Sequence, residues 1–325
     1  MTRNVLVTGG AGYIGSHACK ALRLAGYTPV AYDNLSRGHE WAVKWGPLEE
    51  GDTRDGARLR EVLKRHRPEA VLHFAAYTYV GESVERPLLY AANNVAGTVS
   101  LLEACLEAGV PRVVFSSTAA VYGVPETVPI PESHPRRPMN PYGRTKAFLE
   151  DLLADAFAAH GLASFSLRYF NAAGADEDAD TGEAHDPETH LVPLALQAAR
   201  GALPRLTLYG DDYDTPDGTC IRDYVHVSDL AEAHVLALKS LEKAPRAAAC
   251  NLGIGRGFSV KEVVRAAAEV TGLPIPVEVG PRRPGDPPVL VADPALAGKE
   301  LGWTPRFTDL HAILETAWRW ILLKP

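Results

Sequence analysis

Cysteine is scarce in this sequence, and long apolar runs are absent. The 325 residues include four cysteines far apart with no paired spacing, so the sequence predicts neither a disulfide framework nor a cysteine zinc site. No apolar run approaches the roughly 20 residues that span a bilayer. The opening residues, MTRNVLVTGG, lack the apolar core of a signal peptide. We therefore expect a soluble cytoplasmic protein without membrane contact.

Positive charge is also in short supply. Lysine and arginine number 33 against 40 aspartate and glutamate, a formal net charge of −7. This balance argues against nucleic acid or an anionic membrane surface as the main partner. It leaves room for an anionic small ligand, which needs only a local positive site. With 46% hydrophobic and 22% charged residues, the chain is an ordinary globular one rather than a disordered one.

Strand-like and helical patterns alternate through the first half of the chain. Strands are predicted at 4–8, 28–32, 70–74, 112–116 and 164–170, and helices at 15–25, 88–108 and 142–160. Parallel strands need long crossovers, which these helices supply. The pattern predicts an α/β fold, with a Rossmann-type doubly wound parallel sheet.

The composition and the secondary-structure pattern change after residue 171. Residues 175–190 are acidic and turn-rich, and prolines crowd the stretch 274–288. We predict a Rossmann domain at 1–171, to which parts of 219–256 return, and a smaller C-terminal lobe formed mainly by 172–325. Ligands of such open sheets bind at the carboxyl ends of the strands, so we expect the site between the two parts.

A glycine-rich loop follows the first predicted strand and opens the first helix. Gly9, Gly12 and Gly15 allow a backbone to approach a pyrophosphate, although the spacing G-x-x-G-x-x-G departs from the commonest dinucleotide fingerprint. Asp33 ends the second strand, where a carboxylate would bind an adenosine ribose and repel a 2′-phosphate. This favours NAD over NADP, although Arg37 could pair with such a phosphate. The simpler alternatives are a tight turn and a helix cap.

Tyr142 and Lys146 stand four residues apart on a predicted helix, and therefore on one face. A nearby ammonium and a cationic nicotinamide ring would both lower the pKa of the phenol, which makes the pair a plausible proton shuttle. Thr118 ends a strand at the same edge of the sheet and could bind a substrate hydroxyl, although turn capping is the simpler interpretation.

Several longer motifs carry a family resemblance. They include TGGAGYIGSH at 8–17, YDNLSRG at 32–38, SSTAAVYG at 116–123, NPYGRTK at 140–146, DGTCIRDYVHVSDLA at 217–231 and RPGDP at 283–287. On these motifs the chain resembles the extended short-chain dehydrogenase/reductase superfamily and, within it, the family of UDP-glucose 4-epimerases.

The resemblance implies an enzyme that interconverts UDP-glucose and UDP-galactose with tightly held NAD. Tyr142 would take the proton of the sugar 4-hydroxyl while C4 gives a hydride to NAD. Lys146 would lower the phenol pKa and bind the nicotinamide ribose, and Thr118 would orient the 4-hydroxyl. The 4-keto sugar would then turn over before the hydride returns. In this family the helices within 88–108 and 142–160 pair across a homodimer.

The resemblance also assigns binding residues. The NAD site would contain Gly9, Gly12, Tyr13, Ile14, Gly15, Asp33, Asn34, Ser36, Gly38, Asp52, Thr53, Phe74, Ala75, Asn93, Tyr142, Lys146 and Phe170. The UDP-sugar site would contain Thr118, Tyr142, Asn171, Leu191, Tyr209, Arg222, Arg283, Asp286 and Leu290. Guanidinium forks such as those of Arg222 and Arg283 suit phosphate oxygens.

Three positions depart from the family pattern. Thr78 replaces a lysine that often contacts the cofactor, and His190 replaces an asparagine of the substrate site. Leu290 occupies the position that limits bulk at the sugar 2-position. Leucine is intermediate in size there, so we expect some acceptance of UDP-GlcNAc and UDP-GalNAc.

Alternatives remain open. They are another nucleotide-sugar epimerase, such as a UDP-glucuronate or UDP-arabinose 4-epimerase, and a non-catalytic NAD-sensing module, which would typically lose Tyr142 or Lys146. A 4,6-dehydratase is disfavoured because alanines, not an acid pair, follow Thr118. We interpret His185–His190 as a solvated loop, because Pro187 breaks a regular helix there, and expect no metal.

Overall fold

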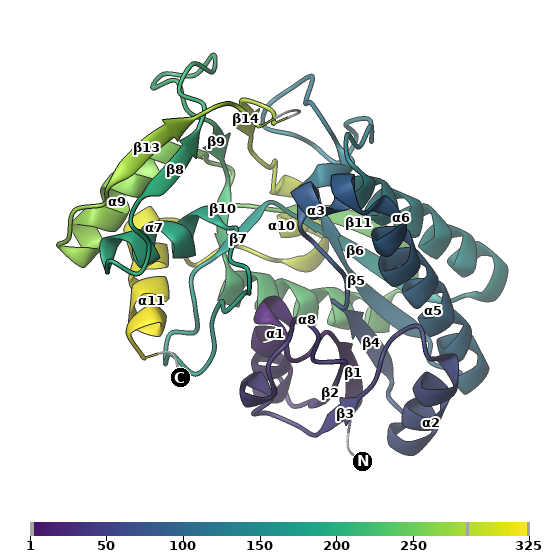
Figure 1. The fold of residues 1–325 in the computed structure, drawn as a ribbon. Helices are drawn as coiled ribbons and strands as arrows, with labels where there is room; N and C mark the ends of the chain where they lie inside the picture. Colours follow the sequence, from purple (N-terminus) through teal and green to yellow (C-terminus); the bar gives the residue numbers. More distant parts are fainter. Residues whose placement is uncertain (1–2, 284–285, 324–325) are drawn as a thin grey trace.

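The computed structural model describes residues 3–283 and 286–323. Its main feature is a seven-stranded sheet in the order β11-β6-β5-β4-β1-β2-β3 (Figure 1). Every neighbouring pair in this sheet is parallel. The strands are β1 (Asn4–Thr8), β2 (Thr28–Asp33), β3 (Leu48–Glu50), β4 (Ala70–His73), β5 (Arg112–Thr118), β6 (Ala163–Tyr169) and β11 (Ala247–Leu252). The prediction of a doubly wound α/β fold is confirmed.

Helices cover both faces of this sheet because its strands are apolar on both sides. Val5 and Val7 of β1 join one buried cluster with helices α1 and α8, while Leu6 between them joins another with α2, α5 and α6. The helices of this part are α1 (Tyr13–Leu24), α2 (Gly56–His66), α3 (Val80–Glu85), α4 (Pro87–Tyr90), α5 (Gly97–Ala108), α6 (Pro141–His160), α8 (Val227–Lys243) and α10 (Ala295–Leu301), with short 3₁₀ turns at Glu40–Ala42 and Ala119–Val121.

A second group of elements builds its own apolar cluster around α7, α9 and α11. Figure 1 shows these helices apart from the large sheet, beside small sheets that pair β8 with β13, β7 with β10, and β9 with β12 and β14. The elements are β7 (Asn171–Ala173), α7 (Leu191–Ala199), β8 (Leu206–Tyr209), β9 (Ile221–Arg222), β10 (Tyr224–His226), β12 (Phe258–Ser259), α9 (Val260–Thr271), β13 (Val277–Gly280), β14 (Val289–Leu290) and α11 (Leu310–Leu323). The domain boundaries given above stay a prediction.

One predicted helix is not continuous. The stretch 88–108 is α4 and α5 joined by a π-helical turn at Ala91–Ala96. Inside it, Asn94 accepts the N–H of Tyr77 at 2.8 Å and donates to the Tyr77 carbonyl at 3.0 Å. The turn thus places a buried amide against the loop after β4, and its neighbour Asn93 faces the cavity described below. Across the described ranges, no helix combines the length and apolar character needed to traverse a bilayer.

Candidate active site

A large cavity lies at the carboxyl ends of β1, β2, β4 and β5, between the large sheet and the second group of elements. Its volume is about 1460 Å³. Sites for one small ligand typically measure about 300–1,000 Å³, so this cavity has room for two ligands side by side. Its walls come from both parts of the chain.

The glycine-rich loop forms one wall, and its glycines are sterically required. Gly9 has φ +74°, and a Cβ there would lie 2.7 Å from the Ala75 nitrogen. A Cβ on Gly15 would overlap the Gly9 carbonyl. The bare backbone therefore fits closely against the start of α1, whose first amides carry no carbonyl partner within the helix. This cradle fits the pyrophosphate of a dinucleotide.

Asp33 lies beside this loop at the end of β2. Its carboxylate accepts the N–H of Ala11 at 3.0 Å and that of Leu35 at 2.9 Å, and burial raises its pKa. These bonds hold the glycine loop against β2, as the simpler turn interpretation expects. Asp33 also lines the cavity, so its ribose role stays a prediction.

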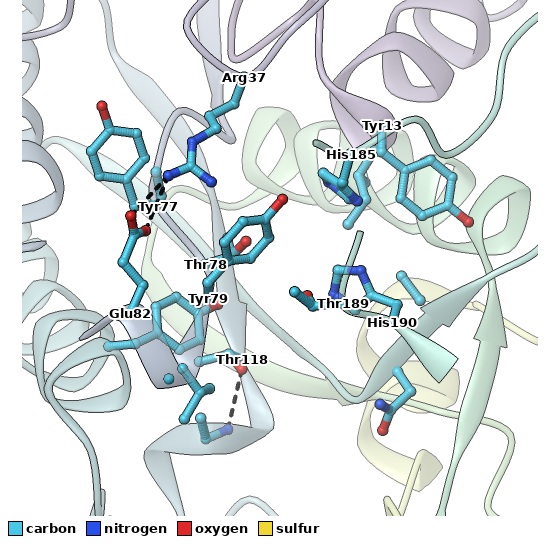
Figure 2. A pocket seen from close by; sticks show the side chains of 18 of the residues that line it. Tyr13, Arg37, Tyr77, Thr78, Tyr79, Glu82, Thr118, His185, Thr189 and His190 are labelled. Atoms are coloured by element: carbon cyan, nitrogen blue, oxygen red, sulfur yellow. Dashed lines mark hydrogen bonds and ion pairs between the residues drawn. The ribbon is translucent and has the colours of Figure 1, made fainter. Parts of the chain in front are cut away.

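Arg37 is held by a partner that sequence reasoning missed. Its guanidinium donates to both oxygens of Glu82, at 3.0 and 3.1 Å, and lies over the rings of Tyr77 and Tyr79 (Figure 2). To bind a 2′-phosphate, Arg37 would first have to give up this pairing with Glu82. This contact strengthens the preference for NAD.

The tyrosine–lysine pair lies at the start of α6. Asn140 caps this helix by accepting the N–H of Gly143 at 2.8 Å, and Pro141 occupies the first turn. Tyr142 is 8% exposed and lines the cavity near Thr118. Lys146 is buried one turn deeper, and its Nζ donates to the Ser116 carbonyl at 2.8 Å.

Burial dominates the charge state of both groups. It raises the pKa of Tyr142 to about 12, although contact with Thr118 opposes the shift. It also lowers the pKa of Lys146 to about 7, against the effect of Glu150. We expected the ammonium of Lys146 to lower the pKa of the Tyr142 phenol. Burial instead favours the neutral form of each group and raises the phenol pKa. That role stays a prediction.

The far end of the cavity carries the charged groups assigned to the UDP-sugar. Arg222 on β9 forms an ion pair with Asp286. The guanidinium of Arg283 stacks over Tyr209 at 4.0 Å from the ring centroid. Leu290 pairs with Arg222 in the β14–β9 register, and so faces the same space.

The structure brings nearly all the assigned residues to this one cavity. Every residue named above for the NAD and UDP-sugar sites lines it except Asp52 and Lys146. The carboxylate of Asp52 accepts hydrogen bonds from Asn34 at 2.9 Å and from Arg54 at 2.6 Å, so it lies behind the residues that line the cavity. Thr78 also lines the cavity.

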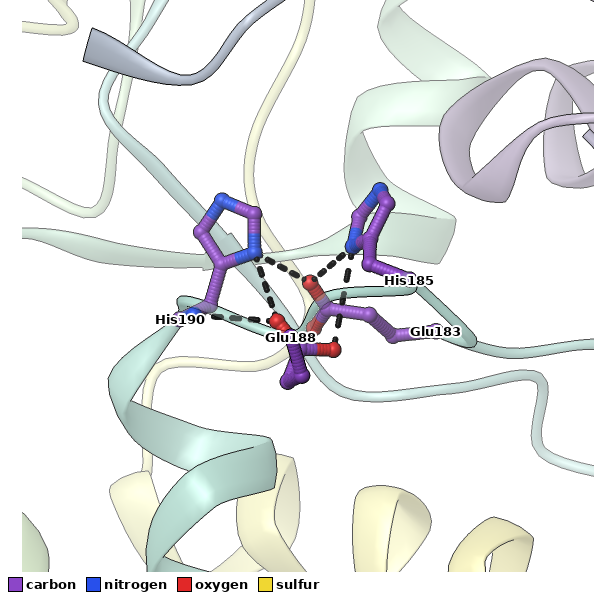
Figure 3. A group of neighbouring side chains, drawn as sticks. All are labelled: Glu183, His185, Glu188 and His190. Carbon is purple, nitrogen blue, oxygen red and sulfur yellow. Dashed lines mark hydrogen bonds and ion pairs between the residues drawn. The ribbon is translucent and has the colours of Figure 1, made fainter. Parts of the chain in front are cut away.

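The segment His185–His190 is a loop with Asp186, Pro187 and Thr189 exposed, as expected, but three of its other side chains converge with that of Glu183 beside the cavity (Figure 3). We call them the His–Glu cluster: Glu183, His185, Glu188 and His190. The two carboxylate side chains are each only 7% exposed, because the loop folds inward over α11 and the Trp320 indole donates to the Glu183 carbonyl at 2.9 Å. Sequence reasoning saw Pro187 and inferred irregular backbone, which does not determine where side chains point.

The His–Glu cluster is strongly charged. Burial lowers the pKa of both imidazoles, but the two carboxylates outweigh it and raise the pKa of His185 to about 9 and that of His190 to about 10. The same contacts hold the carboxyl pKa values below their usual range. Figure 2 shows His185 and His190 across the cavity from Tyr77 and Glu82.

Comparison with known proteins agrees with this geometry. The sequence model described as "NAD dependent epimerase/dehydratase family" matches residues 5–253. The chain belongs to this family. It is 54% identical to the UDP-glucose 4-epimerase of Rhizobium meliloti over 98% of this chain and 96% of that protein.

Two solved structures show the same fold over nearly the whole length. The UDP-glucose 4-epimerase of Brucella ovis in complex with NAD is 56% identical, with a TM-score of 0.96 and 98% of each chain covered. The UDP-glucose-4-epimerase of Stenotrophomonas maltophila, with bound NAD and formylated UDP-arabinopyranose, is 44% identical, with a TM-score of 0.95, covering 99% of this chain and 98% of that one.

Proposed function

We propose that this protein is an NAD-dependent UDP-glucose 4-epimerase that interconverts UDP-glucose and UDP-galactose. One observation carries the proposal: a continuous cavity joins the glycine cradle, the Tyr142 phenol and the paired arginine end. In the same fold, the Brucella ovis relative binds NAD, and the Stenotrophomonas maltophila relative binds NAD and formylated UDP-arabinopyranose. The persistence of both Tyr142 and Lys146 disfavours a non-catalytic NAD sensor.

The chain's residues divide the work by position. The glycine loop, Asp33 and Lys146 would hold NAD, which would supply reversible hydride transfer at the sugar C4. Tyr142 holds and returns the proton of the 4-hydroxyl, since it lines the cavity and is 8% exposed. Thr118 orients that hydroxyl from the end of β5. Lys146, buried behind them, supplies positive charge that favours the phenolate.

Firm anchoring of the diphosphate leaves the sugar free to turn. Arg222 and Arg283 line the same cavity as Tyr142. Guanidinium groups bind phosphate oxygens, so we assign these two residues to the diphosphate. Binding energy from this unreacting group can hold the substrate while the 4-keto ring reorients.

The proposal is tested by incubating the purified protein with UDP-galactose, without added cofactor, and identifying the products by NMR. We expect UDP-glucose and UDP-galactose to reach one equilibrium mixture from either side. Absorbance in the NADH band should rise and fall without lasting reduction. Absence of interconversion, also after addition of NAD, would overturn the proposal.

The sugar range extends this proposal. Leu290 packs beside Val121 and Tyr122 at the cavity wall, and an aliphatic side chain leaves more room there than an aromatic one. We propose partial acceptance of UDP-GlcNAc and UDP-GalNAc. Equal assays with UDP-glucose and UDP-GlcNAc test this, and no turnover of UDP-GlcNAc ends it.

We also propose that the protein is a cytoplasmic homodimer. Leu88 on α4 and Phe148 on α6 are 82% and 52% exposed, which leaves apolar side chains on the helices expected to pair. The four cysteines are buried free thiols, as a reducing compartment allows. Light scattering should give a dimer mass, and Phe148→Glu should lower it; a monomer mass for the unchanged protein would refute the dimer.

A further inference from the structure

The His–Glu cluster gathers four potential ligand atoms at one point. The Nδ1 atoms of His185 and His190 lie between 2.7 and 3.8 Å from oxygens of Glu183 and Glu188. One ligand atom from each residue fits within 4.8 Å of all the others. Zinc bonds of about 2.0–2.2 Å place tetrahedral ligands about 3.3–3.6 Å apart, so small side-chain shifts suffice to surround an ion.

The ligand charges of the His–Glu cluster suit a divalent cation. An ion that displaces the imidazole protons leaves two carboxylates with a charge of −2, which the ion balances. In the part of the chain that the structure describes, no lysine or arginine forms an ion pair with either carboxylate. Other buried carboxylates, such as Glu150, pair with arginine instead. The ion-pair partners of these two carboxylates are imidazoles, which can release their protons to a metal ion.

Surrounding bonds fix the ligands in place. Glu188 accepts the backbone N–H groups of Thr189 at 2.8 Å and His190 at 2.9 Å. The Tyr79 hydroxyl donates to the Pro187 carbonyl at 2.8 Å, which ties the loop to the opposite side of the cavity. Metal sites depend on such outer contacts, because they reduce the entropy lost when the ligands are ordered.

We propose that the His–Glu cluster binds one divalent transition-metal ion, with Zn²⁺ as the best match. Two imidazole nitrogens and two carboxylate oxygens are the ligand types that Zn²⁺ takes in proteins. Glu183, His185 and His190 line the cavity, so the ion would stand in its wall, next to the first residue of α7. The site rests on these side chains alone and stands whether or not the proposed epimerase activity is correct.

The test measures metal binding by the full-length protein, purified without a histidine tag and stripped with EDTA. Titration calorimetry with Zn²⁺ alone should show one ion per chain. Co²⁺ alone should give visible d–d bands of a low-symmetry nitrogen–oxygen site. Zn²⁺ should also raise the Tm, because a ligand that binds only the native state stabilises it.

Two variants of the His–Glu cluster and one outside it make the test specific. The double variant His185→Ala/His190→Ala should lose stoichiometric binding and the Co²⁺ bands, and the near-isosteric Glu188→Gln should weaken binding by at least about tenfold. His311→Ala is the control, since His311 lies outside the His–Glu cluster in an exposed group, 2.7 Å from Glu269 and 3.8 Å from Asp309. It should bind like the unchanged protein.

The alternative is a cluster filled by protons, which satisfies the same heavy-atom distances. It predicts no stoichiometric Zn²⁺ binding, or binding that Glu188→Gln and the double variant leave unchanged. Either result would overturn the proposal. Because Glu188→Gln keeps the shape of the side chain, its folded state, checked by circular dichroism, keeps the test valid if the double variant does not fold.

Discussion

Titratable groups are buried in two different ways in the walls of this cavity. At the start of α6, burial outweighs the charge of Glu150 and drives both Tyr142 and Lys146 toward their neutral forms. In the His–Glu cluster, burial also acts on the imidazoles, whose side chains are 19% and 43% exposed, but two carboxylates reverse its effect on their pKa values. The comparison shows that burial alone favours neutral side chains, which become charged only when a charged ligand binds. Burial beside an oppositely charged group keeps the side chains charged without a ligand.

Removing the phenol should have the largest effect on this comparison. Tyr142→Phe deletes the proton carrier and leaves the glycine cradle intact, so kcat/KM should fall by about 10²–10⁴-fold while NAD stays bound. Steady-state assays and the absorbance of bound cofactor measure the two properties. Tyr169→Phe removes another buried phenol from the same cavity and should keep most of the turnover. Full activity in Tyr142→Phe would contradict the mechanism.

The buried lysine comes next. Lys146→Met keeps the length of the side chain but removes the ammonium group behind Tyr142, so kcat should fall by on the order of 10²-fold. Without that charge the phenol needs a higher pH to ionise, and the acidic limb of the pH–rate profile should move upward. An unchanged profile would show that Lys146 acts only on the cofactor ribose.

A smaller effect is expected at Arg37, whose charge is paired like that of the His–Glu cluster. Glu82→Gln removes the carboxylate and frees the guanidinium, so affinity for NADP should rise by on the order of tenfold, about 1.4 kcal/mol. Fluorescence titrations with NAD and NADP measure this shift. Glu85→Gln, on the same helix, is the control. Equal NADP affinity in both variants would place the discrimination at Asp33 instead.

The core supplies a test of unpaired burial through stability. His73 and His226 have pKa values lowered by burial to about 3, and His17 and His234 to about 4. The unfolded chain binds these protons near pH 6.5, so the free energy of unfolding should fall as pH drops from about 6.5 toward 4. Urea unfolding across this range measures the slope. A flat profile would contradict the assignment of neutral core histidines.

Local patterns predicted much of this molecule. Local sequence patterns predicted the glycine loop, the place of Asp33 at a strand end, and the shared helix face of Tyr142 and Lys146. These features depend on residues that are close together in the sequence. Strand β3 and helix α2 escaped notice, since Leu48–Glu50 is a short, acidic strand whose pairing with β2 is set by the fold.

Longer-range contacts were beyond sequence reasoning. The π-turn at Ala91–Ala96 exists because Asn94 binds a loop 17 residues earlier, which no helical period reveals. The pairing of Arg37 with Glu82 spans 45 residues. The His–Glu cluster was visible as a motif, but its inward orientation depends on Trp320, near the far end of the chain.

The claim that one hydride leaves and returns within a single cavity is tested most directly with UDP-glucose deuterated at C4. In ordinary water, the UDP-galactose formed should keep its deuterium at C4, because the sugar's own hydride comes back to it. NMR of the product measures this retention. Replacement of the deuterium by solvent hydrogen would contradict the account.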